Sequence, residues 1–184
     1  MPALNSARFA RPSAVKVSQG SLVSVSSAPE EQFPLVLRPG QAGAVNLADW
    51  ARTSRPLIEE RLARHGALLF RDFGVDSVHG FEQFLGAVAP GLIEYGERSS
   101  PRTRIGNGVY TSTDHPPDQS ILLHNEQSYT LDWPMKIIFY WELPARRPGG
   151  TPVADSRKIL ARLSPAAVER FREKQVMYVR NYGD

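Results

Sequence analysis

A short apolar run that ends in a histidine and a carboxylate is the feature that most constrains this chain. Ile121-Leu122-Leu123 is followed at once by His124-Asn125-Glu126. An apolar run with a polar end predicts a buried strand, and residues i and i+2 of a strand project from the same face. His124 and Glu126 are therefore expected to bind one ion between them. They are two of the three ligand types that hold non-haem Fe(II) with open positions, and no histidine follows His124 to supply the third.

The residues alone leave other interpretations of this triplet open. His124 and Glu126 could simply hydrogen-bond each other at a strand end, or could perform acid–base chemistry without a metal, which nothing else in the sequence favours. The other three histidines are weaker candidates. His65 fits a helix C-terminus and His79 the polar side of a helix, whereas His115, in a loop nine residues before His124, could approach the site.

Composition excludes several classes of protein. The 184 residues, 41% hydrophobic and 22% charged, suit one globular domain, and no apolar stretch approaches the roughly 18 to 20 residues of a membrane span. The chain has no cysteine, which excludes disulfides, thiolate-bound zinc and iron–sulfur clusters. The net charge of +3 comes from Arg8, Arg11 and Lys16, which precede the first acidic residue, Glu30. The remaining sequence is neutral, so we expect no nucleic-acid partner.

The first half of the chain predicts an extension followed by a helix, a strand and a helix. Residues 1–30 are rich in Ser, Ala and Arg and are expected to be a poorly ordered N-terminal extension, although the lack of acids before Glu30 also resembles a transit peptide. Residues 31–184 are expected to form one domain. Apolar spacing predicts a helix over 47–63 that Pro56 breaks and His65-Gly66 ends, a buried strand over 67–73, and a second helix. The apolar face of that second helix consists of Phe81, Phe84, Leu85 and Val88.

The second half predicts a long loop, several strands and two short helices. Residues 97–118 have loop composition, and a loop of this length is more often functional than idle. Residues 136–143 are expected to form a central strand, and residues 151–155 and 176–181 shorter ones. Asp155 or Ser156 is expected to cap one helix, and Ser164-Pro165 to open another that ends near Lys174.

Four ordered motifs carry a resemblance to a known family. They are Leu123-His124-Asn125-Glu126-Gln127-Ser128-Tyr129, then Trp133-Pro134, then Gly149-Gly150-Thr151-Pro152-Val153-Ala154-Asp155-Ser156-Arg157, and Met177-Tyr178-Val179-Arg180-Asn181-Tyr182-Gly183. The similarity extends upstream through Arg98-Ser99-Ser100-Pro101-Arg102 and Tyr110-Thr111-Ser112-Thr113. Together they resemble the TauD/TfdA family of Fe(II)- and 2-oxoglutarate-dependent dioxygenases, with the SyrP-like branch of antibiotic synthesis the closest.

The resemblance implies a fold and a set of site residues. The expected fold is mixed α+β and mainly β, a double-stranded β-helix (jelly roll, clavaminate synthase-like) with flanking helices, incomplete at the C-terminus. His124 and Glu126 correspond to the iron ligands and Thr151 to the threonine that contacts 2-oxoglutarate. Near the substrate we expect a lid formed by residues 95–120, with contacts from Arg98, Arg102, Tyr110, Thr111 and Ser112. The family's distal His and its 2-oxoglutarate-binding Arg are expected beyond Asp184, a role to which Arg180 is not assigned.

The implied activity is hydroxylation of an unactivated C–H bond of a small molecule by Fe(II), 2-oxoglutarate and molecular oxygen. A free or carrier-protein-bound amino acid in secondary metabolism is the substrate class that the branch suggests, and the expected location is cytoplasmic. Because Glu126 is present, hydroxylation is favoured over halogenation. The 184 residues are expected to be inactive alone. One alternative is a non-catalytic accessory or interaction domain derived from this fold, and another is a homo-oligomer in which a second chain completes the site.

Overall fold

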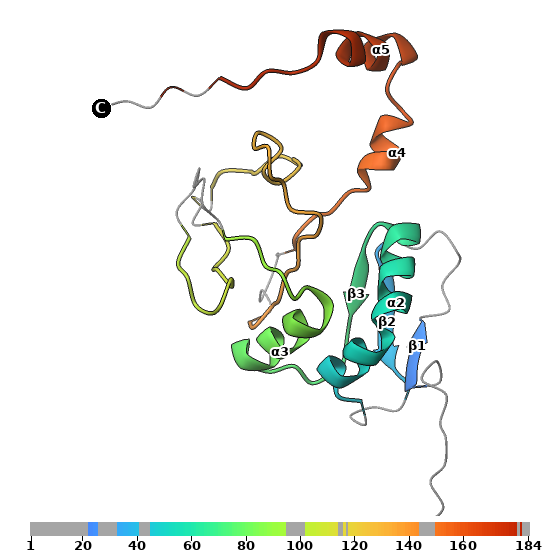
Figure 1. Cartoon of the computed structure of the whole chain (residues 1–184), viewed down its shortest axis with the longest axis vertical. Coiled ribbons are helices and arrows are strands. Elements are labelled where there is room, and N and C mark those ends of the chain that lie inside the picture. Colours follow the sequence, from blue (N-terminus) through green and yellow to red (C-terminus); the bar gives the residue numbers. More distant parts are fainter. Residues whose placement is uncertain are drawn as a thin grey trace, which may run out of the picture.

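A three-stranded mixed sheet forms one layer of the core. The computed structural model describes residues 22–25, 33–40, 45–94, 102–113, 116, 118–143, 150–179 and 181. The strands β1 (Val23–Val25), β2 (Leu35–Pro39) and β3 (Leu68–Phe70) lie in the order β1-β2-β3. β1 pairs antiparallel with β2, and β3 pairs parallel with β2 on its other side (Figure 1). The central strand therefore carries Leu37, which is fully buried.

Helix α2 (Leu47–His65) connects β2 to β3 and lies beside the sheet (Figure 1). The Asn46 side chain accepts a hydrogen bond from the Asp49 amide at the N-terminus, and Gly66 ends the helix in the left-handed conformation, with φ of 79°. The expected stop at His65-Gly66 is confirmed, but the expected break at Pro56 is wrong, because the helix continues through it. Proline costs about 3 kcal/mol inside a helix. The caps and the buried face that includes Trp50 and Ile58 offset this cost.

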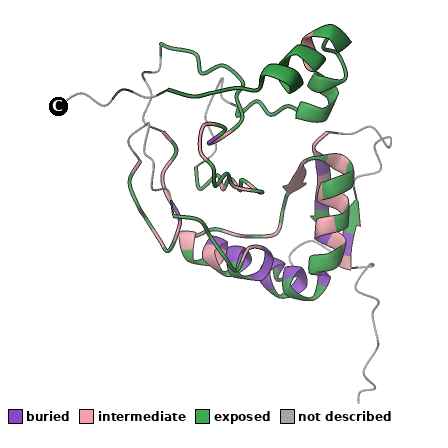
Figure 2. Ribbon diagram, turned by 45° about the horizontal axis from the view of Figure 1, so that its top comes forward, coloured by how far each residue is buried: buried purple, intermediate pink, exposed green. Residues whose placement is uncertain are grey.

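Helix α3 (Val78–Val88) packs against α2 and completes the core. Ser77 caps its N-terminus by accepting from the Gly80 amide. The predicted apolar face is confirmed, and buried residues concentrate on α2, α3 and the sheet (Figure 2). Aromatic rings join these layers, because Phe70 of β3 makes edge-on contacts with Trp50 of α2 and Phe84 of α3 at centroid distances of 6.4 and 5.2 Å.

Four strands predicted in the rest of the chain are absent from the described residues. Residues 121–126, 136–143, 151–155 and 176–179 are irregular, and the predicted strand over 67–73 shortens to β3. Helices outweigh strands in the described part, so the expected predominance of β-structure is not seen there. The run before His124 is also exposed rather than buried, with Leu122 82% accessible. A strand forms only when a neighbouring strand satisfies its backbone hydrogen-bonding groups. No described segment pairs with any of these four predicted strands.

The sheet also reaches into the expected N-terminal extension. β1 lies within residues 1–30, and its Val23 is buried. The other residues of that range, apart from Leu22, lie outside the described part of the chain. Residues 22–25 thus belong to the sheet, although they precede the boundary expected at residue 30.

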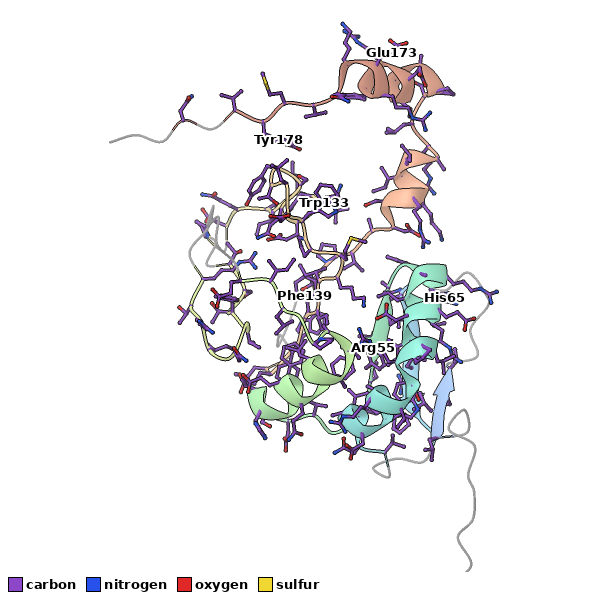
Figure 3. The ribbon with its side chains drawn as sticks, viewed as in Figure 1. Arg55, His65, Trp133, Phe139, Glu173 and Tyr178 are labelled. Carbon is purple, nitrogen blue, oxygen red and sulfur yellow. The ribbon has the colours of Figure 1, made fainter. Side chains whose placement is uncertain are left out.

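Residues 136–143 keep the alternation of a strand without its pairing. Lys136, Ile138 and Tyr140 turn toward the core, whereas Ile137 and Phe139 are half-exposed. Lys136 forms an ion pair with Glu59 of α2. The Tyr140 ring stacks on Phe81 of α3 at 5.0 Å and its hydroxyl donates to the Val75 carbonyl. This segment is therefore fixed to both core helices along one side. Its Phe139 is labelled in Figure 3.

Two exposed helices follow, as the sequence predicts. They are α4 (Ser156–Leu160), capped by Asp155, and α5 (Pro165–Lys174), capped by Ser164 with Pro165 at its first position. Neither helix buries a residue, and both lie away from the sheet (Figures 1 and 2). Within the described ranges, every helix falls short of the length and apolarity that crossing a membrane requires.

Candidate functional site

The His124 ring is oriented by a backbone carbonyl. Its Nδ1 lies 2.7 Å from the Leu122 carbonyl oxygen. A carbonyl can only accept, so Nδ1 carries a proton and donates it. In the neutral ring, Nε2 then presents its lone pair, and a backbone partner of this kind is what fixes metal-binding histidines.

Glu126 faces this lone pair. His124 Nε2 and Glu126 Oε2 are 3.5 Å apart. Two acceptors at this distance repel each other unless a cation lies between them, which is either a second proton on the ring or a metal ion. Two donors that bind one ion at right angles, each about 2.1 Å from it, lie about 3 Å apart. The pair therefore fits two positions of a metal ion after a shift of about half an ångström.

The other oxygen of Glu126 binds Arg102. The Arg102 Nη2 lies 3.1 Å from Glu126 Oε1, and its Nε donates to Thr113 Oγ1 at 3.2 Å. The Arg102 and Glu126 side chains are each only 22% exposed, whereas the His124 side chain is 58% exposed. The carboxylate is thus held from the protein side and the imidazole lies at the solvent side.

Arg102 and Thr113 stand at the open end of residues 102–113, here called the hairpin. Its two arms are joined by an antiparallel bridge between Arg104 and Tyr110 and by the Thr111 amide, which donates to the Thr103 carbonyl at 2.9 Å. Of the expected substrate residues, Arg102, Tyr110, Thr111 and Ser112 therefore lie on the two arms of one hairpin, and Arg102 among them contacts Glu126. Arg98 and His115 lie outside the described residues.

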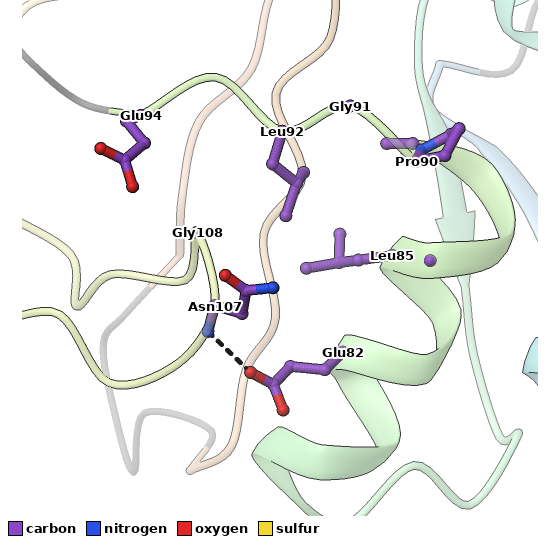
Figure 4. A pocket seen from close by; sticks show the side chains of 10 residues that line it. Glu82, Leu85, Pro90, Gly91, Leu92, Glu94, Asn107 and Gly108 are labelled. Carbon is purple, nitrogen blue, oxygen red and sulfur yellow. Dashed lines mark hydrogen bonds between the residues drawn. The ribbon is translucent and has the colours of Figure 1, made fainter.

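The closed end of the hairpin is anchored to α3. Glu82 accepts a hydrogen bond from the Asn107 amide at 2.8 Å, and Val109 is buried in the core (Figure 4). A hollow of about 340 Å³ lies between this turn and the end of α3. It is lined by Glu82, Leu85, Gly86, Ala89, Pro90, Gly91, Leu92, Glu94, Asn107 and Gly108. The hairpin thus connects the core at one end to the His124–Glu126 pair at the other.

Thr151 is exposed on the segment that leads into α4. The end of that segment contacts Asn125, which lies between His124 and Glu126, because Ser156 Oγ donates to Asn125 Oδ1 at 3.0 Å. A direct contact of Thr151 with His124 or Glu126 is not among the described contacts, so its cosubstrate role stays a prediction. The turn after Glu126 is also held from the C-terminal side, since the Tyr129 and Tyr178 rings meet edge-on at 6.4 Å.

Asp155 and Arg157 clamp the start of α4 to the end of α2. The Arg157 guanidinium donates to both oxygens of Asp155 and, through Nη1, to the Ala63 carbonyl at 2.6 Å. It therefore satisfies a carbonyl at the negative end of the helix dipole. Gly66 leaves it room, because a Cβ there would lie 2.8 Å from Arg157 Nη2.

This clamp makes the approach of α4 sensitive to acid. The hydrogen bond from Arg157 holds the pKa of Asp155 below its ordinary value. A carboxylate with a lowered pKa stabilises the folded state above the unfolded value, about 3.9, and loses that effect as the pH falls through the folded value. We expect NMR titration of the Asp155 carboxyl to give a midpoint below about 3.9, and Arg157→Gln to raise it. An unchanged midpoint in Arg157→Gln would contradict the clamp.

A third ligand for an ion is not present near the pair in the described part of the chain. No group of three or more His, Asp or Glu residues suited to a metal occurs there. His79 bonds to Gln83 on α3, and His65 lies in the last turn of α2. The described residues thus offer two ligands.

Three contacts of the site were not predicted from the sequence. They are the Leu122 carbonyl that orients His124, Thr113 beside Arg102, and Ser156 on Asn125. Thr113 follows directly on the predicted contacts Tyr110, Thr111 and Ser112, so its position in the motif was a usable signal. The other two depend on how irregular chain folds back, for which the sequence holds no local signal.

The described site is a His124–Glu126 pair, 3.5 Å apart, beside a mixed α+β core. Comparison with known proteins identifies its family. The chain belongs to the taurine catabolism dioxygenase TauD, TfdA family, whose model matches residues 31–184. The family expected from the motifs is confirmed.

Two relatives support the assignment. The chain is 38% identical over 125 residues to the dapdiamide synthesis protein DdaC of Enterobacter agglomerans. This match covers 68% of the chain and 38% of that protein. It is 31% identical over 162 residues to a clavaminate synthase-like protein of Arabidopsis thaliana. This match covers 83% of the chain and 49% of that protein. The chain therefore spans less than half the length of either relative.

Proposed function

We propose that this chain forms the N-terminal part of an Fe(II)- and 2-oxoglutarate-dependent oxygenase that hydroxylates an unactivated C–H bond of a small molecule. Membership of the TauD/TfdA family supports the reaction class and the double-stranded β-helix as the complete fold. The single observation that carries the site assignment is the 3.5 Å approach of His124 Nε2 to Glu126 Oε2, with Nδ1 of the same ring bonded to the Leu122 carbonyl.

In this proposal His124 and Glu126 hold Fe(II) and a third ligand comes from outside the described residues. With 2-oxoglutarate and molecular oxygen, the bound iron supplies the oxidising power, which no protein side chain provides. The Leu122 carbonyl holds the proton of the neutral ring on Nδ1, so that Nε2 is the nitrogen offered to the ion, and Arg102 keeps one carboxylate oxygen turned toward the ion. The Thr151 hydroxyl donates a hydrogen bond to a 2-oxoglutarate carboxylate.

The hairpin supplies one wall for the substrate. Tyr110, Thr111 and Ser112 lie on the arm that ends at Thr113, next to the carboxylate ligand. The name of DdaC places that relative in the synthesis of dapdiamide. A free or carrier-protein-bound amino acid is accordingly the substrate class we propose.

Oxygen uptake and succinate formation test this function. Because each relative is more than twice as long as its matched part, two proteins are compared: residues 1–184 and the longest product of the same reading frame. We expect the longer product to form succinate in a substrate-dependent way across a screen of free and carrier-bound amino acids. Residues 1–184 are expected to form little, because two ligands bind iron less tightly than three.

Two outcomes would contradict the proposal. Vigorous turnover by residues 1–184 would show that the described pair is not an incomplete site. A longest product that binds Fe(II) and 2-oxoglutarate poorly and forms no succinate with any substrate would favour the accessory or interaction domain instead.

A further inference from the structure

We propose that Arg102 is a positioning residue for the Glu126 carboxylate, and that the hairpin transmits this position from α3 to the metal site. This inference rests on the proposed function, in which Glu126 is a metal ligand. The observation behind it is a continuous series of contacts, from Glu82 on α3 through the hairpin to Arg102 and then Glu126.

The first step is that the hairpin has a fixed end. The Glu82 carboxylate accepts from the Asn107 amide at 2.8 Å, and the buried Val109 anchors the turn in the core. The amides of Ile105 and Gly106 both donate to the Val109 carbonyl, at 3.0 and 3.2 Å. The turn also fits Glu82 closely, because a Cβ at Gly106 would clash with the Glu82 carboxylate.

The second step is that both arms hold the Arg102 side chain. Arg102 starts one arm, and its Nε donates to Thr113 Oγ1, which ends the other. The arms themselves are joined by the Thr103 amide, which donates to Thr111 Oγ1 at 3.0 Å. A guanidinium that is bonded at Nε has little freedom to rotate, so the direction of its Nη2 is fixed as well.

The third step is the contact with Glu126. Arg102 Nη2 lies 3.1 Å from Oε1, and Oε2 of the same carboxylate faces His124. A ligating carboxylate is usually oriented by such a partner, whose loss costs about ten- to a hundredfold in metal affinity. The positive charge of Arg102 opposes metal binding, but it lies on the oxygen away from His124, so we expect orientation to dominate.

Metal titration of matched variants tests the inference. Co(II) serves as the probe, with its ligand-field absorption as the readout, on the longest product of the reading frame. We expect Arg102→Gln to lower Co(II) affinity about ten- to a hundredfold, Arg102→Lys to recover part of it, and Thr113→Val to lower it less, because only the Nε contact is lost. Arg104→Gln is the control, since Arg104 lies on the same hairpin but pairs with Glu94 at 3.6 Å.

A metal-free measurement separates this inference from the proposed function. Hydrogen exchange at residues 103–111 is compared in the apo wild type, Arg102→Gln, Glu126→Gln and the double variant. We expect each single variant to speed exchange and the double variant to add nothing further. If wild type fails to bind Co(II) but this coupling is found, the proposed function fails while the contact stands. Additive effects of Arg102→Gln and Glu126→Gln on hydrogen exchange would overturn the inference. So would a Co(II) affinity within twofold of wild type in both Arg102→Gln and Thr113→Val.

Discussion

Replacing His124 with alanine is expected to lower Fe(II) affinity by at least about a hundredfold, because loss of a ligand should exceed the ten- to hundredfold cost of losing a ligand's partner. Only Nε2 of this ring faces the Glu126 carboxylate, and the Leu122 carbonyl fixes the proton on Nδ1. The readout is an anaerobic Fe(II) titration. Folding should be unaffected, because the His124 side chain is 58% exposed.

His79→Ala is the matched control for this prediction. His79 is also an exposed histidine with one hydrogen-bond partner, Gln83, but it lies on α3. We expect it to leave Fe(II) affinity unchanged. Equal affinity in His124→Ala and wild type would remove His124 from the metal site, and equal losses in both variants would indicate nonspecific binding.

Replacing Leu37 with alanine is expected to destabilise the fold by about 2–5 kcal/mol. Leu37 is fully buried in the central strand, where β1 and β3 flank it through Val25 and Phe70. A cavity there has sheet on both sides and the helix layer above it, so the surroundings have little freedom to collapse. This is a large share of the roughly 5–15 kcal/mol that stabilises a typical domain.

Urea unfolding of Leu37→Ala and Leu131→Ala measures this effect. Leu131 is 94% exposed, so the same chemical change should cost less than about 0.5 kcal/mol. A loss below about 1 kcal/mol at Leu37 would contradict its central place in the core. A comparable loss at Leu131 would mean that this residue is covered.

Local signals predicted local structure well. Gly66, Asp155 and Ser164 end or begin helices as expected, because a cap depends on the backbone within three or four residues of it. Pro56 was misread for the opposite reason. Its cost is local, but the packing of α2 against the sheet and α3 is not, and the packing prevails.

The strands and the site contacts show what the sequence alone does not determine. Ile121–Leu123 has the pattern of a buried strand, yet a pattern states only which face is apolar and not which segment covers it. The triplet His124-Asn125-Glu126 and its motifs identified the family and the candidate ligands. The pairing of Arg102 with Glu126 joins residues 24 positions apart and exists only because the hairpin brings Arg102 back to the triplet.

X-ray absorption at the iron edge tests the central claim, that His124 and Glu126 are ligands of one Fe(II), most directly. The Fe(II)-loaded wild type, His124→Ala and Glu126→Ala are compared, with His79→Ala as control. We predict that outer-shell imidazole scattering weakens in His124→Ala. In both ligand variants, the lost protein ligand leaves fewer nitrogen and oxygen neighbours around the iron or is replaced by water. The spectrum of the control matches that of wild type. Identical imidazole scattering in His124→Ala and wild type would contradict the assignment.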